Sequence, residues 1–130
     1  MKKLLLGLIL IVISTSAIAD FKLITISQDD NGSYSVGLDT KDIKKSGKNL
    51  KKAWITDNYG DTQTTKSDMK SRKVLYEFNC KDGLYRVLQL VEYSGTNGGG
   101  KTLGSFFYKE DFVDINPNTL SEMFYKAICN

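Results

Sequence analysis

The amino-terminal residues carry the pattern of a secretory signal peptide, and this feature limits the possible folds more than any other. Two lysines follow Met1, residues 4–13 form an apolar run, and residues 17–19 form a small-x-small cleavage motif. The run is shorter than the roughly 20 residues that a membrane-spanning helix needs, although an uncleaved anchor is the alternative. We therefore expect a signal peptide over residues 1–19 and a protein that does not span the membrane after cleavage.

Removal of the predicted signal peptide leaves a short domain with almost no net charge. Residues 20–130 suffice for one domain, which buries only about two-thirds of its unfolded surface. Removing Lys2 and Lys3 from the 18 basic residues leaves 16 against 15 acidic residues, so this domain carries a net charge of +1. A nearly neutral domain lacks the excess positive charge on which nucleic-acid binding depends. We expect no nucleic-acid partner.

Histidine is absent from the sequence. Its absence excludes Ser-His-Asp and Cys-His catalytic arrangements and removes the commonest metal ligand. Carboxylate, lysine or tyrosine chemistry is the remaining enzymatic alternative, but no two acidic residues stand at a spacing typical of a catalytic pair. The sequence therefore predicts a protein with no catalytic residues, no cofactor and no metal site.

The only two cysteines, Cys80 and Cys129, form an even pair in an exported domain. This setting favours a structural disulfide, with two free buried thiols as the alternative. Closing a loop of about fifty residues stabilises a fold by roughly 4 kcal/mol in the chain-entropy model. A disulfide leaves neither sulfur available as a nucleophile or a metal ligand.

Alternating apolar residues predict six strands, and an apolar stripe predicts a helix at the end of the chain. The strands are expected over residues 21–27, 33–38, 53–59, 71–80, 84–94 and 101–108, and the stripe consists of Leu120, Met123, Phe124, Ala127 and Ile128. Asn116 is the expected N-cap and Pro117 the expected first helical residue. Together they predict an α+β fold, a single antiparallel sheet of about six strands with one C-terminal helix packed on one face. Cys129, at the helix end, could then reach Cys80.

Residues 95–102 match the pattern G-x-x-x-x-G-K-[ST] of a phosphate-binding loop. Such a loop needs a helix that begins at the Lys-Thr pair, because the helix N-terminus faces the phosphate. Here Lys101 and Thr102 lead into an aromatic-rich segment typical of a strand. The pattern therefore predicts a long hairpin turn whose glycines supply positive φ angles, and no nucleotide partner.

Two groups of residues are candidates for binding a partner. The first is a basic run of six lysines: Lys41, Lys44, Lys45, Lys48, Lys51 and Lys52. It is either a solvated loop between strands or a docking patch for an acidic partner such as a matrix glycoprotein, heparan sulfate or an anionic lipid. The second is an apolar row on one side of a predicted strand: Tyr85, Val87, Val91 and Tyr93. A single helix cannot cover both faces of the sheet, so this row is either buried under loops or part of a homodimer or partner interface.

The sequence also resembles the surface-adhesin protein E family of Gram-negative bacteria. The resemblance rests on residues 73–80, Tyr85-Arg86, Tyr93-Ser94-Gly95, Gly100-Lys101, residues 112–115, Pro117, Glu122 and Cys129. It implies a six-stranded antiparallel sheet with a C-terminal helix tied to it by a disulfide. It also implies adhesion to host matrix and serum proteins, often by a dimer.

These observations predict an exported binding domain over residues 20–130 that adheres to host matrix or serum proteins through the open sheet face and the basic run. A periplasmic inhibitor or immunity protein that blocks a wall-degrading enzyme or a toxin is the alternative, because such proteins are equally small and disulfide-linked. The first cysteine is Cys80, far from the cleavage motif. We therefore expect a protein of the periplasm or the outer cell surface that is not lipid-anchored.

Overall fold

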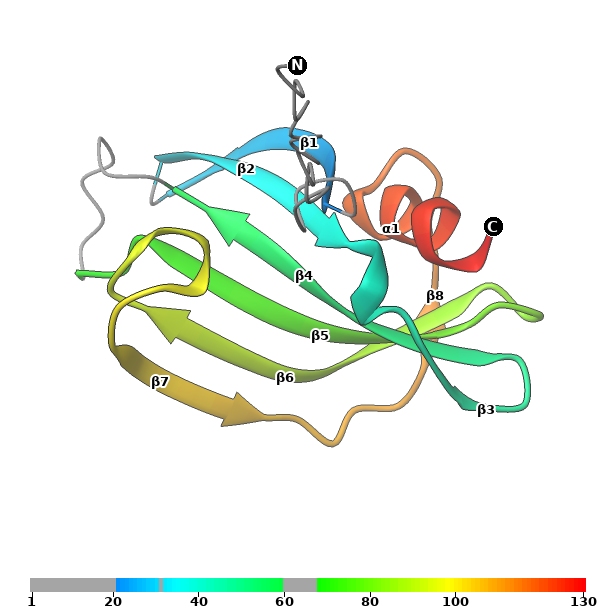
Figure 1. Ribbon diagram of the computed structural model, residues 1–130. Coiled ribbons are helices and arrows are strands. Elements are labelled where there is room, and N and C mark those ends of the chain that lie inside the picture. The colour runs from blue at the N-terminus through cyan, green and yellow to red at the C-terminus, as the bar shows by residue number, and fades with distance from the viewer. Residues whose placement is uncertain (1–20, 31, 60–67) are drawn as a thin grey trace, which may run out of the picture.

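The computed structural model describes residues 21–30, 32–59 and 68–130, so the predicted signal peptide lies outside the described residues. The strands are β1 (Phe21–Asp29), β2 (Gly32–Asp39), β3 (Lys44–Gly47), β4 (Leu50–Asn58), β5 (Ser71–Asn79), β6 (Leu84–Tyr93), β7 (Thr102–Phe107) and β8 (Val113–Asp114). The helices are α1 (Leu120–Cys129) and two 3-10 turns, η2 (Thr40–Asp42) and η3 (Thr96–Gly98). Figure 1 shows their arrangement.

The strands form one antiparallel sheet, and this confirms the predicted fold class. Its six main strands are ordered β1-β2-β4-β5-β6-β7. Neighbours in the sheet are therefore also successive main strands along the chain. The two short strands were not predicted: β3 pairs with β4, and β8 pairs with β6. Both contain residues with little apolar alternation, which is the signal on which strand prediction depends.

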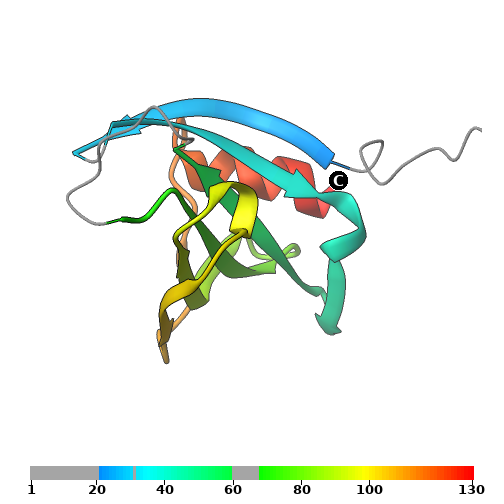
Figure 2. The ribbon, with the colours of Figure 1, turned by 60° about the vertical axis from the view of Figure 1, so that its left-hand side comes forward.

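Helix α1 packs on one face of the sheet and closes the hydrophobic core. Phe124 and Ile128 are buried from the helix side, and they meet apolar side chains that alternate along β2, β4 and β5. The strand residues of this core are Tyr34, Val36, Leu38, Ala53, Ile55 and Phe78. Strands β1 and β2 bend over the helix (Figure 2). The helix therefore lies between the curled edge of the sheet and its centre.

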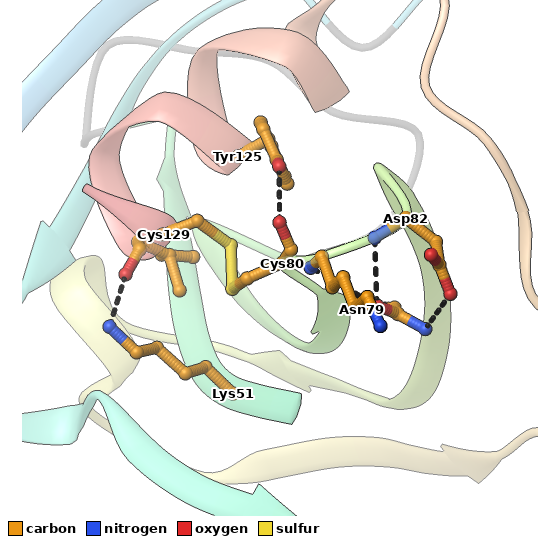
Figure 3. Close-up of a disulfide and its surroundings, with 8 residues drawn as sticks. Lys51, Asn79, Cys80, Asp82, Tyr125 and Cys129 are labelled. Carbon is orange, nitrogen blue, oxygen red and sulfur yellow. Dashed lines mark hydrogen bonds between the residues drawn. A yellow bond between two sulfur atoms is a disulfide. The ribbon is translucent and has the colours of Figure 1, made fainter. Parts of the chain in front are cut away.

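The disulfide joins the C-terminal end of α1 to the residue that follows β5, as predicted. The sulfurs of Cys80 and Cys129 are 2.08 Å apart, and their Cα atoms are 5.5 Å apart. Two hydrogen bonds support the same end of the helix (Figure 3): the Tyr125 hydroxyl donates to the Cys80 carbonyl at 2.7 Å, and the Lys51 ammonium donates to the Ile128 carbonyl at 3.4 Å. The last bond satisfies one of the carbonyls that a helix C-terminus leaves without a partner in the helix.

The prediction of the helix start was wrong by three residues. Asn116 is not the N-cap; Thr119 is, and its hydroxyl accepts a hydrogen bond from the Glu122 backbone N–H. Asn118 has a left-handed φ of 60°, so the backbone at Pro117 cannot continue into the helix. The residues Thr119-Leu-Ser-Glu122 match the capping-box pattern, which is the signal that the Asn-Pro pair concealed.

Removing the disulfide should lower stability without changing the fold. We expect the double variant Cys80→Ala/Cys129→Ala to lose about 2–5 kcal/mol of unfolding free energy, because its unfolded chain regains the freedom of a long loop. Urea denaturation of residues 20–130 measures this. An unchanged midpoint would show that packing and the two hydrogen bonds alone hold the helix.

Candidate binding surfaces

The basic run does not form the predicted loop; most of it forms a β-hairpin. We call residues 44–52 the lysine hairpin: β3, a two-residue turn, and the first part of β4. Asn49, in the turn, has a left-handed φ of 60°, a conformation that asparagine tolerates. Five of the six predicted lysines lie in this hairpin, and Lys41 lies in η2 just before it. Lysine is a poor strand former, so sequence propensity gave no signal for this hairpin.

Like charges lie opposite each other across the lysine hairpin. The register pairs Lys44 with Lys52 and Lys45 with Lys51, so each face of the hairpin carries one lysine pair. Lys51 reaches the helix C-terminus, where the dipole favours a cation. The ammonium groups of the other four hairpin lysines form no ion pair with any described residue. The hairpin is therefore a concentrated and uncompensated positive charge.

The four residues of the predicted apolar row do not share one face, because a β-bulge interrupts β6. The register pairs Tyr76 with Val87 but Leu75 with Gln89, which leaves Leu88 as the extra residue. Tyr85 and Val87 therefore lie on the helix face, where the Tyr85 ring is 6.2 Å from that of Phe78. Val91 and Tyr93 lie on the opposite face, and Val91 is buried. A strand apolar on both sides gives no sequence signal for a bulge.

The face away from the helix, which we call the outer face, carries an apolar row that the sequence analysis did not single out. Trp54 pairs with Leu75, Leu75 with Gln89, and Gln89 with Phe107, so their side chains cross the sheet in one line. Phe107 is 77% exposed, while Trp54 and Leu75 are half-buried. We call Trp54, Leu75 and Phe107 the outer row. Strand alternation alone could have placed each of them on a face, but only the register aligns them.

Charged residues flank the outer row. On one side the register aligns Lys52, Glu77 and Arg86, and the Arg86 guanidinium donates two hydrogen bonds to Glu77 at 2.7 and 2.9 Å. On the other side it aligns Thr56 with Lys73. An apolar centre with a polar border is the usual anatomy of a protein–protein interface.

The glycine-rich segment is a hairpin loop, as predicted, and not a phosphate site. Lys101 and Thr102 lead into β7 and not into a helix. The loop folds back over the end of the outer face: the Ser71 hydroxyl donates to the Gly95 carbonyl at 2.6 Å and accepts from the Gly98 N–H at 2.8 Å. The Asn97 N–H donates to the Asn58 side chain at 3.0 Å. Backbone N–H groups that a phosphate would need are thus used within the protein.

A partly buried charge cluster joins β1, β4 and β5 on the helix face. The Arg72 guanidinium donates to the Asp57 carboxylate at 2.7 Å and lies 3.6 Å from the Asp29 carboxylate. The Tyr59 hydroxyl donates to Asp29 at 2.7 Å, and the rings of Tyr34 and Tyr59 lie within 6 Å of the guanidinium. The single guanidinium bridges the two carboxylates, so the cluster is a structural connection between strands.

The cluster shifts the ionisation of its members. Burial raises the pKa of Asp57 above its usual value of 3.8, and the hydrogen bond and charge of Arg72 offset only part of this rise. Burial and the hydrogen bond to Asp29 raise the pKa of Tyr59. Burial alone would lower the pKa of Arg72, but the hydrogen bond and charge of Asp57 raise it overall. At neutral pH the arginine is therefore charged and the tyrosine neutral.

Removing the arginine should make stability more sensitive to pH. In Arg72→Met the carboxylate of Asp57 is buried without its partner, so its pKa rises further and we expect a loss of about 2 kcal/mol at pH 7.5. Because a raised carboxyl pKa means that the folded state holds the proton more tightly, this loss should shrink as pH falls toward 4. Urea denaturation at both pH values tests this. The exposed pair Lys126–Glu122 provides the control: Lys126→Met should cost under about 0.5 kcal/mol at either pH.

Metal sites and membrane-spanning helices are two further possible features of the described residues. It contains no group of three or more cysteine, aspartate or glutamate side chains that could hold a metal ion. No helix within residues 21–30, 32–59 and 68–130 has the length and apolar character needed to cross a membrane.

Comparison with known proteins confirms the resemblance that the sequence predicted. The model of the family described as surface-adhesin protein E matches residues 23–130. Among solved structures, the chain is similar to the crystal structure of protein E from non-typeable Haemophilus influenzae, with a TM-score of 0.57. The two are 14% identical in sequence, over 84% of this chain and 83% of that one, which shows a shared fold. No curated protein matches the sequence.

Proposed function

This chain belongs to the surface-adhesin protein E family, and we propose that it binds host matrix or serum proteins through the outer row and its charged borders. The family is one of adhesins, which are in general binding proteins and not enzymes. The observation that carries the proposal is the alignment of Trp54, Leu75 and Phe107 across the face that α1 leaves uncovered.

The outer row has the chemistry of a binding anchor. Aromatic side chains dominate the energetics of protein interfaces, because they bury a large area at a small cost in conformational entropy. Phe107 is 77% exposed on an edge strand, so a partner that covers it gains apolar burial without rearranging the core. The salt bridge between Glu77 and Arg86 gives the border a fixed geometry, which favours a specific partner.

The sheet holds these side chains in place. Trp54 lies on β4 and Leu75 on β5, and residues that alternate with them on the same strands are buried under α1. Contact through such a preformed surface loses little entropy on binding, which is an advantage for an adhesin that must capture a partner quickly. The lysine hairpin lies beyond the outer row, where β4 begins and β5 ends.

Truncating the outer row should weaken binding without unfolding the domain. We expect Phe107→Ala and Trp54→Ala each to reduce binding to immobilised matrix extract or serum proteins at least about tenfold, the loss typical of an aromatic anchor. The matched control is Met123→Ala, which removes a 46% exposed apolar side chain from α1, away from the outer face. Biolayer interferometry measures all three, with thermal melting to verify folding. Equal losses in the control, or no binding by the unmodified domain, would contradict the proposal.

Adhesion also requires that the protein reach the outer surface of the cell. We expect protease added to intact cells to cleave it, and an antibody against residues 20–130 to label those cells. Protection until the outer membrane is permeabilised would contradict a surface adhesin and would favour the periplasmic inhibitor.

A further inference from the structure

The positive charge of this protein is concentrated at one place. Residues 41–52 contain six lysines and one aspartate, a net charge of +5, so the other residues of 20–130 together carry −4. The structure gathers most of these lysines in the lysine hairpin, which projects at one end of the sheet (Figure 1). A charge of one sign at one end of a nearly neutral molecule steers and orients a partner of the opposite sign.

The fold itself does not explain this concentration. Like charges directly opposite each other in a sheet are destabilising, and the hairpin contains two such pairs, Lys44–Lys52 and Lys45–Lys51. Within the described residues, Lys51 is the one hairpin lysine with a partner, the Ile128 carbonyl at the helix C-terminus. Glu77 lies opposite Lys52 in β5, but its carboxylate is already held by two hydrogen bonds from Arg86. An external anion would relieve the repulsion that the chain leaves in place.

The shape of the site favours a polymer over a small anion. On one face Lys45 and Lys51 line a groove of about 270 Å³ with Asn49, Leu50 and Cys80. Lys44 and Lys52 lie on the other face, and Lys48 lies at the tip between the two faces. No small anion can contact both faces at once, whereas a flexible chain of anionic groups can pass around the tip.

The side-chain chemistry favours sulfated sugar over phosphate or lipid. Arginine, which grips phosphate through two parallel hydrogen bonds, is absent from the hairpin, and both arginines of the chain are held in ion pairs of the sheet. Firm binding to a membrane surface usually adds inserted apolar side chains to the attraction of basic residues, but the only large apolar side chain in the hairpin, Leu50, is half-buried and packs close to Gly47, so a lipid surface would be held by charge alone. Lysine ammoniums on a polar ribbon suit a hydrated polymer whose charges are spaced along it.

We propose that the lysine hairpin is a binding site for a sulfated glycosaminoglycan chain, distinct from the outer row and sharing only Lys52 with its border. This inference deepens the proposed function, because such chains are components of the host matrix. The hairpin binds the polymer by charge, and the outer row binds protein by apolar contact. The two sites are therefore expected to respond to different variants and to different salt concentrations.

The test compares two quadruple variants of residues 20–130 that change net charge equally. The hairpin variant is Lys44→Gln, Lys45→Gln, Lys48→Gln and Lys52→Gln, which spares Lys51 and its contact with α1. The control variant is Lys22→Gln, Lys101→Gln, Lys109→Gln and Lys126→Gln, all at exposed positions outside the hairpin. Calorimetry with heparin should show a loss of at least about tenfold in affinity for the hairpin variant and under about threefold for the control. Heparin should also raise the melting temperature of the unmodified domain and of the control variant only.

Competing polymers identify the ligand chemistry. Desulfated heparin, double-stranded DNA and phosphatidylserine vesicles should each bind more weakly than heparin. Equal losses in the two variants, or tighter binding of DNA or vesicles, would overturn the proposal. Phe107→Ala should keep full affinity for heparin, so a failure of the outer row and a failure of the hairpin are distinguishable.

Discussion

The packing of one short helix on one face of the sheet is the constraint on which the rest of this structure depends. Phe124 and Ile128 bury the apolar side chains of β2, β4 and β5, and without them that face would lie open to water. A ten-residue helix is too short to be stable alone, so its position depends on tertiary contacts. The disulfide, the Tyr125 hydroxyl and Lys51 all act at its C-terminal end. Because α1 covers one face only, the outer face has no helix over it.

Charge is distributed in two different ways in this protein. Among the described residues, the two buried carboxylates each pair with an arginine: Asp57 with Arg72, and Glu77 with Arg86. At the lysine hairpin the charges are alike, and four of the five lysines have no partner among the described residues. Burying an unpaired charge costs several kcal/mol, whereas water screens an exposed one. Buried ions therefore need a partner of opposite charge, whereas lysines at the surface can remain unpaired and available to bind an anion.

Much of the fold could be predicted from the sequence because it depends on local patterns. The main strands, the apolar stripe of the helix and the strand after Lys101 follow from alternation and spacing. The disulfide follows from an even pair of cysteines behind a predicted signal peptide. The helix start was mistaken because Asn116-Pro117 is itself a good helix start, and only the left-handed backbone at Asn118 shows that Thr119 replaces it. Local signals of similar strength compete, and the surrounding structure selects one.

The candidate site was less predictable. Composition and pattern alone determined that the chain has no histidine chemistry, that it forms one sheet and one helix, and that positive charge is concentrated in residues 41–52. Tertiary structure decided which residues share a face. The bulge at Leu88 separates Tyr85 and Val87 from Val91 and Tyr93, and strand register aligns Trp54, Leu75 and Phe107. The physical reason is that side chains alternate along a strand, so one extra residue reverses every face that follows, and pairing between distant strands is set by the whole sheet.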